Sequence, residues 1–148
     1  MVWKPHATVA AIIEDQGKFL LVEELVDGKK VLNQPAGHLE PNESFVAAVI
    51  RETEEETAVV FKPKFIVGFY RWVLQEKDRT YLRLCFSGTM VKQIENQALD
   101  SDIIRTLWLS YDEIIARKNH LRSPLVLECI DDYRNSKRYP LDLLKDLD

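Results

Sequence analysis

Apolar residues gather into two β-prone runs near the start of the chain, with a short polar segment between them. The runs cover Thr8 to Ile13 and Lys18 to Leu25, and the intervening Asp15 to Gly17 is typical of a tight turn. This pattern predicts a β-hairpin. A second turn at residues 27–30 precedes a short extended piece at residues 31–32.

Further along, the strand-like segments become longer and mix polar with apolar residues. We expect strands at 59–61, 65–74, 79–91 and 107–109, with a turn at 75–78. The turn predicts that the second and third of these strands pair with each other.

Three segments carry helix signals. The clearest runs from Asn42 to Glu56, with Asn42 placed to cap it and Glu43 in its first turn. Residues 110–113 have the form of a capping box before a short helix, and Pro124 to Tyr133 predicts a last helix with proline in its first turn. Strands and helices do not alternate strictly, so the expected fold class is α+β, with a mixed sheet between helices. We expect one domain over residues 1–148.

The composition narrows the function classes. The 148 residues are 46% hydrophobic and 30% charged, which is ordinary for a globular protein. The net charge of −4 and the lack of a basic block argue against a partner that is a nucleic acid polymer. No apolar run approaches the ~20 residues of a membrane span, and the N-terminus has no signal-peptide layout.

The two cysteines, Cys85 and Cys129, stand far apart among apolar neighbours. With three histidines they are too few, and too unfavourably spaced, for a structural zinc site. We expect buried free thiols and a cytoplasmic protein.

One face of the first predicted helix changes from apolar to acidic. Phe45, Ala48 and Val49 share a stripe about 120° wide with three carboxylates. The carboxylates are Glu52, Glu55 and Glu56. The helix is therefore expected to leave the core and enter an acidic pocket along one face.

Two interpretations of this acidic end stay open. It could be a solvated face, although anions in the last turn oppose the helix dipole and two carboxylates ~6 Å apart repel by roughly 3 kcal/mol at an effective dielectric of 20. It could instead be a site for a divalent cation such as Mg²⁺, which takes oxygen ligands and shares substrate phosphates. Upstream, Gly37 permits a backbone turn that presents a carbonyl to a ligand.

Taken together, these residues resemble the Nudix box, G-x5-E-x7-R-E-U-x-E-E-x-G-U, in which U is aliphatic. The fixed positions are filled by Gly37, Glu43, Arg51, Glu52, Glu55 and Glu56. Two positions depart from the pattern, because Thr53 stands at an aliphatic position and Ala58 at the closing glycine. Both are structural positions, so they affect local packing more than chemistry. Segments 3–6, 33–40, 100–103, 121–126 and 138–141 resemble a phosphatase branch of the family.

The resemblance implies the Nudix α/β/α sandwich and a hydrolase of pyrophosphate linkages that depends on Mg²⁺, with Mn²⁺ as an alternative. Glu52, Glu55, Glu56 and the Gly37 carbonyl would hold the metal, and one of the glutamates would act as base. Glu43 and Arg51 would hold the loop-helix-loop in shape. The branch implies broad action on nucleoside di- and triphosphates and on hydroxymethylpyrimidine pyrophosphate, with release of phosphate.

Outside the box, the candidates for substrate binding are Arg122, Arg138 and Asp102, with Asp100 beside the last of these. An arginine can hold a phosphate through two parallel hydrogen bonds, and family members often place a further acidic residue across the cleft. The expected partner is a small phosphorylated molecule, and a monomer is the default. Two other functions stay open: a selective pyrophosphatase for ADP-ribose or a nucleoside diphosphate sugar, and a non-catalytic Nudix-like binding module.

Overall fold

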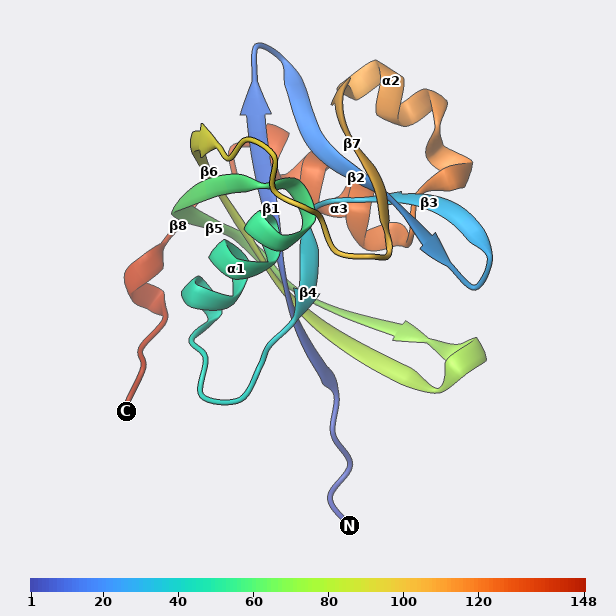
Figure 1. The fold of residues 1–148 in the computed structure, drawn as a ribbon. Helices are drawn as coiled ribbons and strands as arrows, with labels where there is room; N and C mark the ends of the chain where they lie inside the picture. The colour runs from blue at the N-terminus through green and yellow to red at the C-terminus, as the bar shows by residue number, and fades with distance from the viewer.

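The computed structural model describes residues 1–148 and is built around a mixed eight-stranded sheet (Figure 1). The strands are β1 (His6–Asp15), β2 (Lys18–Val26), β3 (Lys29–Asn33), β4 (Ala36–His38), β5 (Val59–Leu74), β6 (Arg79–Gln93), β7 (Ile103–Ser110) and β8 (Tyr139–Pro140). The main path of the sheet runs β3-β2-β1-β6-β5-β8, with β4 pairing to β1 and β7 to β2.

The mixed character of the sheet comes from one central parallel pair. β1 runs parallel to β6 over His6 to Ile13, whereas the other strand pairs are antiparallel. The predicted hairpin of β1 and β2 is confirmed, and its turn holds Gln16 at φ 51° and Gly17 at φ 79°. The segments expected as two strands at 59–61 and 65–74 form the single strand β5, whose pairing with β6 is interrupted by register shifts.

The helices are α1 (Phe45–Thr57), α2 (Tyr111–Ala116) and α3 (Pro124–Arg134). The predicted start of α1 was wrong: Ser44 caps it by accepting from the Ala47 N–H, and Asn42 lies outside it in a left-handed turn at φ 62°. Glu43 therefore also precedes the helix. The capping box at Ser110 and the proline at the start of α3 are confirmed.

Two apolar cores lie on opposite faces of β1, because successive side chains of a strand point to opposite sides. Val9, Ala11 and Ile13 pack in one cluster with Ala48 and Val49 of α1. Ala10 and Ile12 pack in the other cluster, which includes residues of α2 and α3. Helices therefore cover both faces of the sheet, which confirms the expected α/β/α arrangement (Figure 1).

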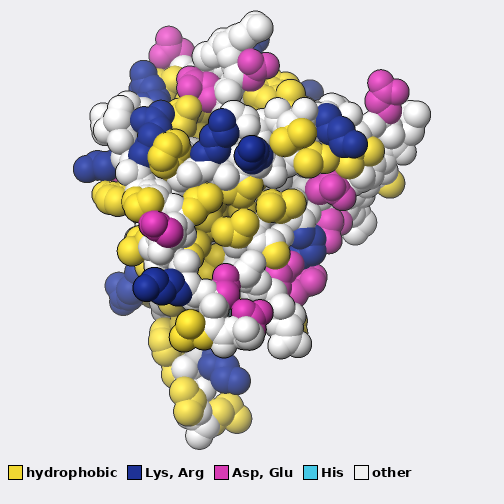
Figure 2. Space-filling model, turned by 90° about the vertical axis from the view of Figure 1, so that its left-hand side faces the viewer, with side chains coloured by type: hydrophobic (Ala, Val, Ile, Leu, Met, Phe, Trp, Pro, Cys, Tyr) yellow, Lys and Arg dark blue, Asp and Glu magenta, His cyan; other side chains and the backbone are white.

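The side of the molecule that carries β8 and the C-terminal residues gathers hydrophobic side chains (Figure 2). An apolar groove of about 570 Å³ lies here between β5 and the C-terminal segment. Its exposed members include Phe69, Tyr139 and Leu143. None of the helices has the length and apolarity that a membrane span requires.

Candidate active site

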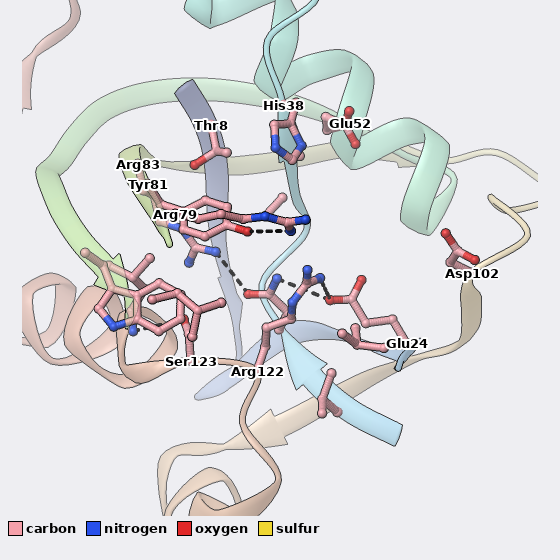
Figure 3. Close-up of a pocket in the computed structure, with 18 of the residues that line it drawn as sticks. Thr8, Glu24, His38, Glu52, Arg79, Tyr81, Arg83, Asp102, Arg122 and Ser123 are labelled. Carbon is pink, nitrogen blue, oxygen red and sulfur yellow. Dashed lines mark hydrogen bonds and ion pairs between the residues drawn. The ribbon is translucent and has the colours of Figure 1, made fainter. Parts of the chain in front are cut away.

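A cleft of about 640 Å³ opens beside the C-terminal half of α1 (Figure 3). Its walls come from strands β1 to β6, from the end of α1, from the loop before β7 and from the start of α3. Residues far apart in the sequence therefore face one space.

A cluster of three carboxylates lies at one end of this cleft. Glu52, Glu55 and Asp100 each offer an oxygen, and these oxygens all lie within 4.8 Å of one another. Asp100 reaches the cluster because its N–H donates a 2.9 Å hydrogen bond to the Glu55 carbonyl oxygen. The predicted acidic pocket is therefore present, and Asp100 joins it from a separate loop.

Glu56 occupies a more enclosed position next to this cluster. Its Oε1 accepts a 3.0 Å hydrogen bond from the Ala36 N–H, and its side chain is buried. Burial raises the pKa of Glu56 to about 9, and the negative charges of Glu24, Glu52 and Asp100 add to the effect. Burial likewise raises the pKa of Glu52. A cation bound nearby would therefore stabilise the ionised form of both carboxylates.

Gly37 serves a different purpose from the expected turn. It lies in β4, opposite Val9 of β1, and directly against the carboxylate of Glu52. A Cβ at Gly37 would overlap that carboxylate. The position needs glycine because of this close approach, with no requirement for a left-handed backbone.

Arg51 connects the helix to the loop that precedes it. Its Nε and Nη2 donate to the two carboxylate oxygens of Glu43 at 2.6 and 2.9 Å, and its Nη2 also donates to the His38 carbonyl at 3.1 Å. Its Nη1 reaches Glu52 at 2.7 Å and Glu55 at 3.1 Å. The hydrogen bond to Arg51 lowers the pKa of Glu43, and the same bond raises that of Arg51.

The other predicted substrate contacts separate into two groups. Arg122 and Asp102 line the cleft, and Arg122 donates a 2.5 Å hydrogen bond to Glu24 (Figure 3). Arg138 does not line the cleft. Its guanidinium lies 5.4 Å from the centre of the Tyr133 ring.

Arg83 and Glu24 also line the cleft, and sequence reasoning missed both. Arg83 is only 5% exposed and Glu24 only 6%. The sequence did offer a signal for them, because each is a charged residue within a strand that is rich in apolar residues. Charged side chains are rarely buried unless they are paired. Arg83 stands between Leu82 and Leu84, and Glu24 lies near the end of β2.

Strand register produces an aromatic row on the cleft floor. His6 of β1 lies opposite Tyr81 of β6, which in turn lies opposite Trp72 of β5. The rings of Trp72 and Tyr81 stack with centroids 5.6 Å apart. Both residues line the cleft, so they offer an apolar surface beside its charged groups.

The acidic end fits a divalent cation. Hard cations prefer carboxylate and carbonyl oxygens, which Glu52, Glu55, Asp100 and the backbone of β4 supply. The missing Cβ at Gly37 leaves the Glu52 carboxylate room beside that backbone.

Known proteins resemble this chain in sequence and in fold. The profile of the NUDIX domain matches residues 4–129. The chain belongs to the Nudix family. Phosphatase NudJ of Escherichia coli strain K12 is 42% identical over 145 residues, which are 98% of this chain and 94% of that protein.

Solved Nudix structures agree with this assignment. A NUDIX hydrolase from Nitrosomonas europaea superposes with a TM-score of 0.95 at 49% identity, covering 97% of this chain and 98% of the other. The MutT protein of Methanosarcina mazei Go1 shares the fold at a TM-score of 0.74 and 24% identity. The superposition covers 93% of this chain and 100% of that protein. This Nudix chain is therefore a hydrolase of pyrophosphate bonds.

Proposed function

We propose that this Nudix hydrolase uses Mg²⁺, or Mn²⁺ in its place, to cleave nucleoside di- and triphosphates and hydroxymethylpyrimidine pyrophosphate with release of orthophosphate. The likeness to Phosphatase NudJ over nearly the whole of both chains supports this substrate range. The observation that carries the metal requirement is the meeting of Glu52, Glu55 and Asp100 at one end of the cleft.

In this proposal Glu52, Glu55, Glu56, Asp100 and the Gly37 carbonyl hold the cation. A bound divalent cation supplies an acidic water and neutralises charge on the phosphate oxygens. The Ala36 N–H fixes Glu56, so that its second oxygen stays free to bind the cation or to accept a proton from the attacking water.

Arg51 has a positioning role in the same proposal. One guanidinium joins Glu43 on the loop to Glu52 and Glu55 on the helix. Because Arg51 contacts both elements, it fixes the carboxylates relative to β4 and keeps their mutual repulsion low. Arg122 and Asp102, which also line the cleft, contact the substrate.

We further propose that residues 1–148 act as one domain, as a monomer, in the cytoplasm. The free, buried state of Cys85 and Cys129 supports a reducing compartment.

The test is the release of orthophosphate from GTP, GDP and hydroxymethylpyrimidine pyrophosphate, measured with and without Mg²⁺ and without an added phosphatase. Glu56→Gln is compared with Glu54→Gln, because Glu54 lies on the same helix but does not line the cleft. We expect activity that requires Mg²⁺, is lost in Glu56→Gln and survives in Glu54→Gln.

Other results would redirect the proposal. Cleavage of ADP-ribose alone, without free phosphate, would indicate a selective pyrophosphatase and would contradict the broad substrate range. Equal activity of the two variants would remove Glu56 from the site.

A further inference from the structure

Arg83 is a cation in the wall of the cleft without an anionic partner. It is 5% exposed and forms no ion pair. Its Nη1 donates to Gln34 Oε1 at 2.9 Å and its Nη2 to Asn33 Oδ1 at 3.3 Å, and both acceptors are neutral amides. Its Nε is buried and has no hydrogen-bond partner. Burying a positive charge whose hydrogen bonds go only to neutral amides costs free energy. An anion bound beside Arg83 would therefore be stabilised strongly.

The surroundings of Arg83 add positive rather than negative charge. Arg83, Arg79 and Arg122 line the same cleft, where Arg122 pairs with Glu24 (Figure 3). Glu24 accepts from Arg122 directly and from Asn33, which itself accepts from Arg83. The side-chain hydrogen bond of Arg79 is to the Tyr81 hydroxyl, at 3.5 Å. Asp27 also lies near Arg79 and Arg122, but it is paired with Lys77 at 2.6 Å. Among these three arginines, only Arg122 forms an ion pair with a carboxylate, that of Glu24.

Helix α3 also favours an anion on this side. Ser123 and Leu125 at its N-terminus line the cleft, where the helix dipole is positive. The residues around Arg83 are tied to the same helix: Gln34 donates to the Val126 carbonyl at 2.7 Å, and the Tyr70 hydroxyl donates to Asp132 at 2.7 Å. Because α3 lies behind these residues, a group that reaches Arg83 ends there.

The register places Arg83 within reach of the metal-binding end. Thr8 of β1 lies opposite His38 of β4 on one side and opposite Arg83 of β6 on the other. Arg83 is therefore two strand spacings, roughly 10 Å between Cα atoms, from the strand that contains Gly37. Arg83 and Gly37 also line the same cleft, so one substrate can contact both ends.

We infer that Arg83, oriented by Asn33 and Gln34 and assisted by Arg122 and the start of α3, forms a subsite for a terminal phosphoryl group. An unsubstituted terminal phosphoryl carries about −1.5 to −2 charges near pH 7 and presents three acceptor oxygens. A phosphate esterified on both sides carries a single charge and continues in both directions, which α3 obstructs. The inference rests on the proposed function and assigns the residue that selects substrates with a free phosphate end.

The test measures binding, so that its outcome is independent of turnover. Calorimetry with Mg²⁺ compares α,β-methylene-ADP, which has a free terminal phosphoryl, with the α,β-methylene analogue of ADP-ribose, which has none. Arg83→Met keeps the apolar stem of the side chain without its charge, Arg83→Lys keeps the charge without the planar fork, and Arg105→Met is the control outside the cleft. Thermal unfolding establishes that each variant is folded.

We expect Arg83→Met to weaken the binding of α,β-methylene-ADP roughly 10- to 100-fold, which is the loss of affinity typical of hydrogen bonds to a charged group. Arg83→Lys should recover part of this loss, while the ADP-ribose analogue changes less than about threefold in every variant. An equal loss for both ligands, or no loss for either, would overturn the inference. If the wild type binds as described but releases no phosphate from ADP, the proposed function fails while the subsite stands.

Discussion

Gly37 lies directly against the Glu52 carboxylate, with no room between them for a Cβ. The glycine is on strand β4 and the glutamate on helix α1. This contact fixes how closely the acidic end of the helix approaches the strand. Adding a single methyl group at Gly37 should therefore be enough to disturb the site.

Gly37→Ala should therefore displace Glu52 and lower activity. A shift of about 1 Å in a catalytic group costs on the order of 100-fold in rate, and overpacking costs about 1–3 kcal/mol of stability. The measurements are Mg²⁺-dependent phosphate release and urea unfolding.

Gly17→Ala is the control for Gly37→Ala, because Gly17 has φ 79° and open space around its Cα. It should lose about 1 kcal/mol of stability from backbone strain and retain full activity. Normal kcat/KM in Gly37→Ala would show that the contact with Glu52 is dispensable.

The raised pKa of Glu56 predicts how the stability of the metal-free protein changes with pH. The folded protein holds a proton on Glu56 up to about pH 9, whereas the unfolded chain releases it near the ordinary value of 4.5. The unfolded state therefore binds fewer protons between these values, and the free energy of unfolding falls as pH rises through this window. The slope contributed by one group is at most about 1.4 kcal/mol per pH unit.

Glu56→Gln should remove most of this slope, because the amide oxygen can still accept from the Ala36 N–H and carries no charge. Above neutral pH the metal-free variant should be more stable than the wild type, as measured by urea unfolding in EDTA at several pH values. Parallel pH profiles for the two proteins would contradict the assignment of the proton to Glu56.

Arg51→Lys should weaken the link between the loop and the helix. Lysine retains the charge but cannot donate in parallel to both oxygens of Glu43. We expect a loss of about 1–3 kcal/mol and a fall in kcat, because hydrogen bonds to charged groups are broken in a pair whose side chains are only 20% and 13% exposed.

The control for Arg51→Lys is Arg105→Lys, whose ion pair with Glu23 leaves the arginine 61% exposed. Its effect should stay within about 0.5 kcal/mol. If the two substitutions have equal effects, the ion pair at Arg51 carries no special role.

Thr53 predicts a substitution that is tolerated. It is fully buried, and its hydroxyl donates to the Val49 carbonyl at 2.7 Å, one turn earlier in α1. That carbonyl also receives a backbone N–H in any α-helix, so Thr53→Val leaves no polar group unpaired. Stability should fall by no more than about 1.5 kcal/mol, the upper end of the net contribution of one hydrogen bond, and activity should be unchanged.

Thr53→Ser tests the other half of the same side chain. It keeps the hydroxyl and removes a buried methyl group, which should cost about 1 kcal/mol in thermal or urea unfolding. A larger loss in Thr53→Val than in Thr53→Ser would show that the hydroxyl, rather than the methyl, is the essential group.

The features that depend on near neighbours in the chain can be predicted from the amino-acid sequence. The β1–β2 hairpin, the capping box at Ser110 and the convergence of Glu52, Glu55 and Glu56 on one helix face follow from local periodicity and turn chemistry. The Nudix spacing likewise identified Gly37, Glu43 and Arg51 before their contacts were known. The start of α1 was less certain, because Asn42 and Ser44 are both residue types that cap helices. In the structure Ser44 accepts the N–H of the first turn.

Which distant residues share the cleft depends on the three-dimensional packing of the chain. Asp100 joins the carboxylates through a backbone hydrogen bond to Glu55, and strand register sets Arg83 opposite Thr8. No local pattern encodes these positions, because each depends on how strands pair and helices cover them across tens of residues of chain.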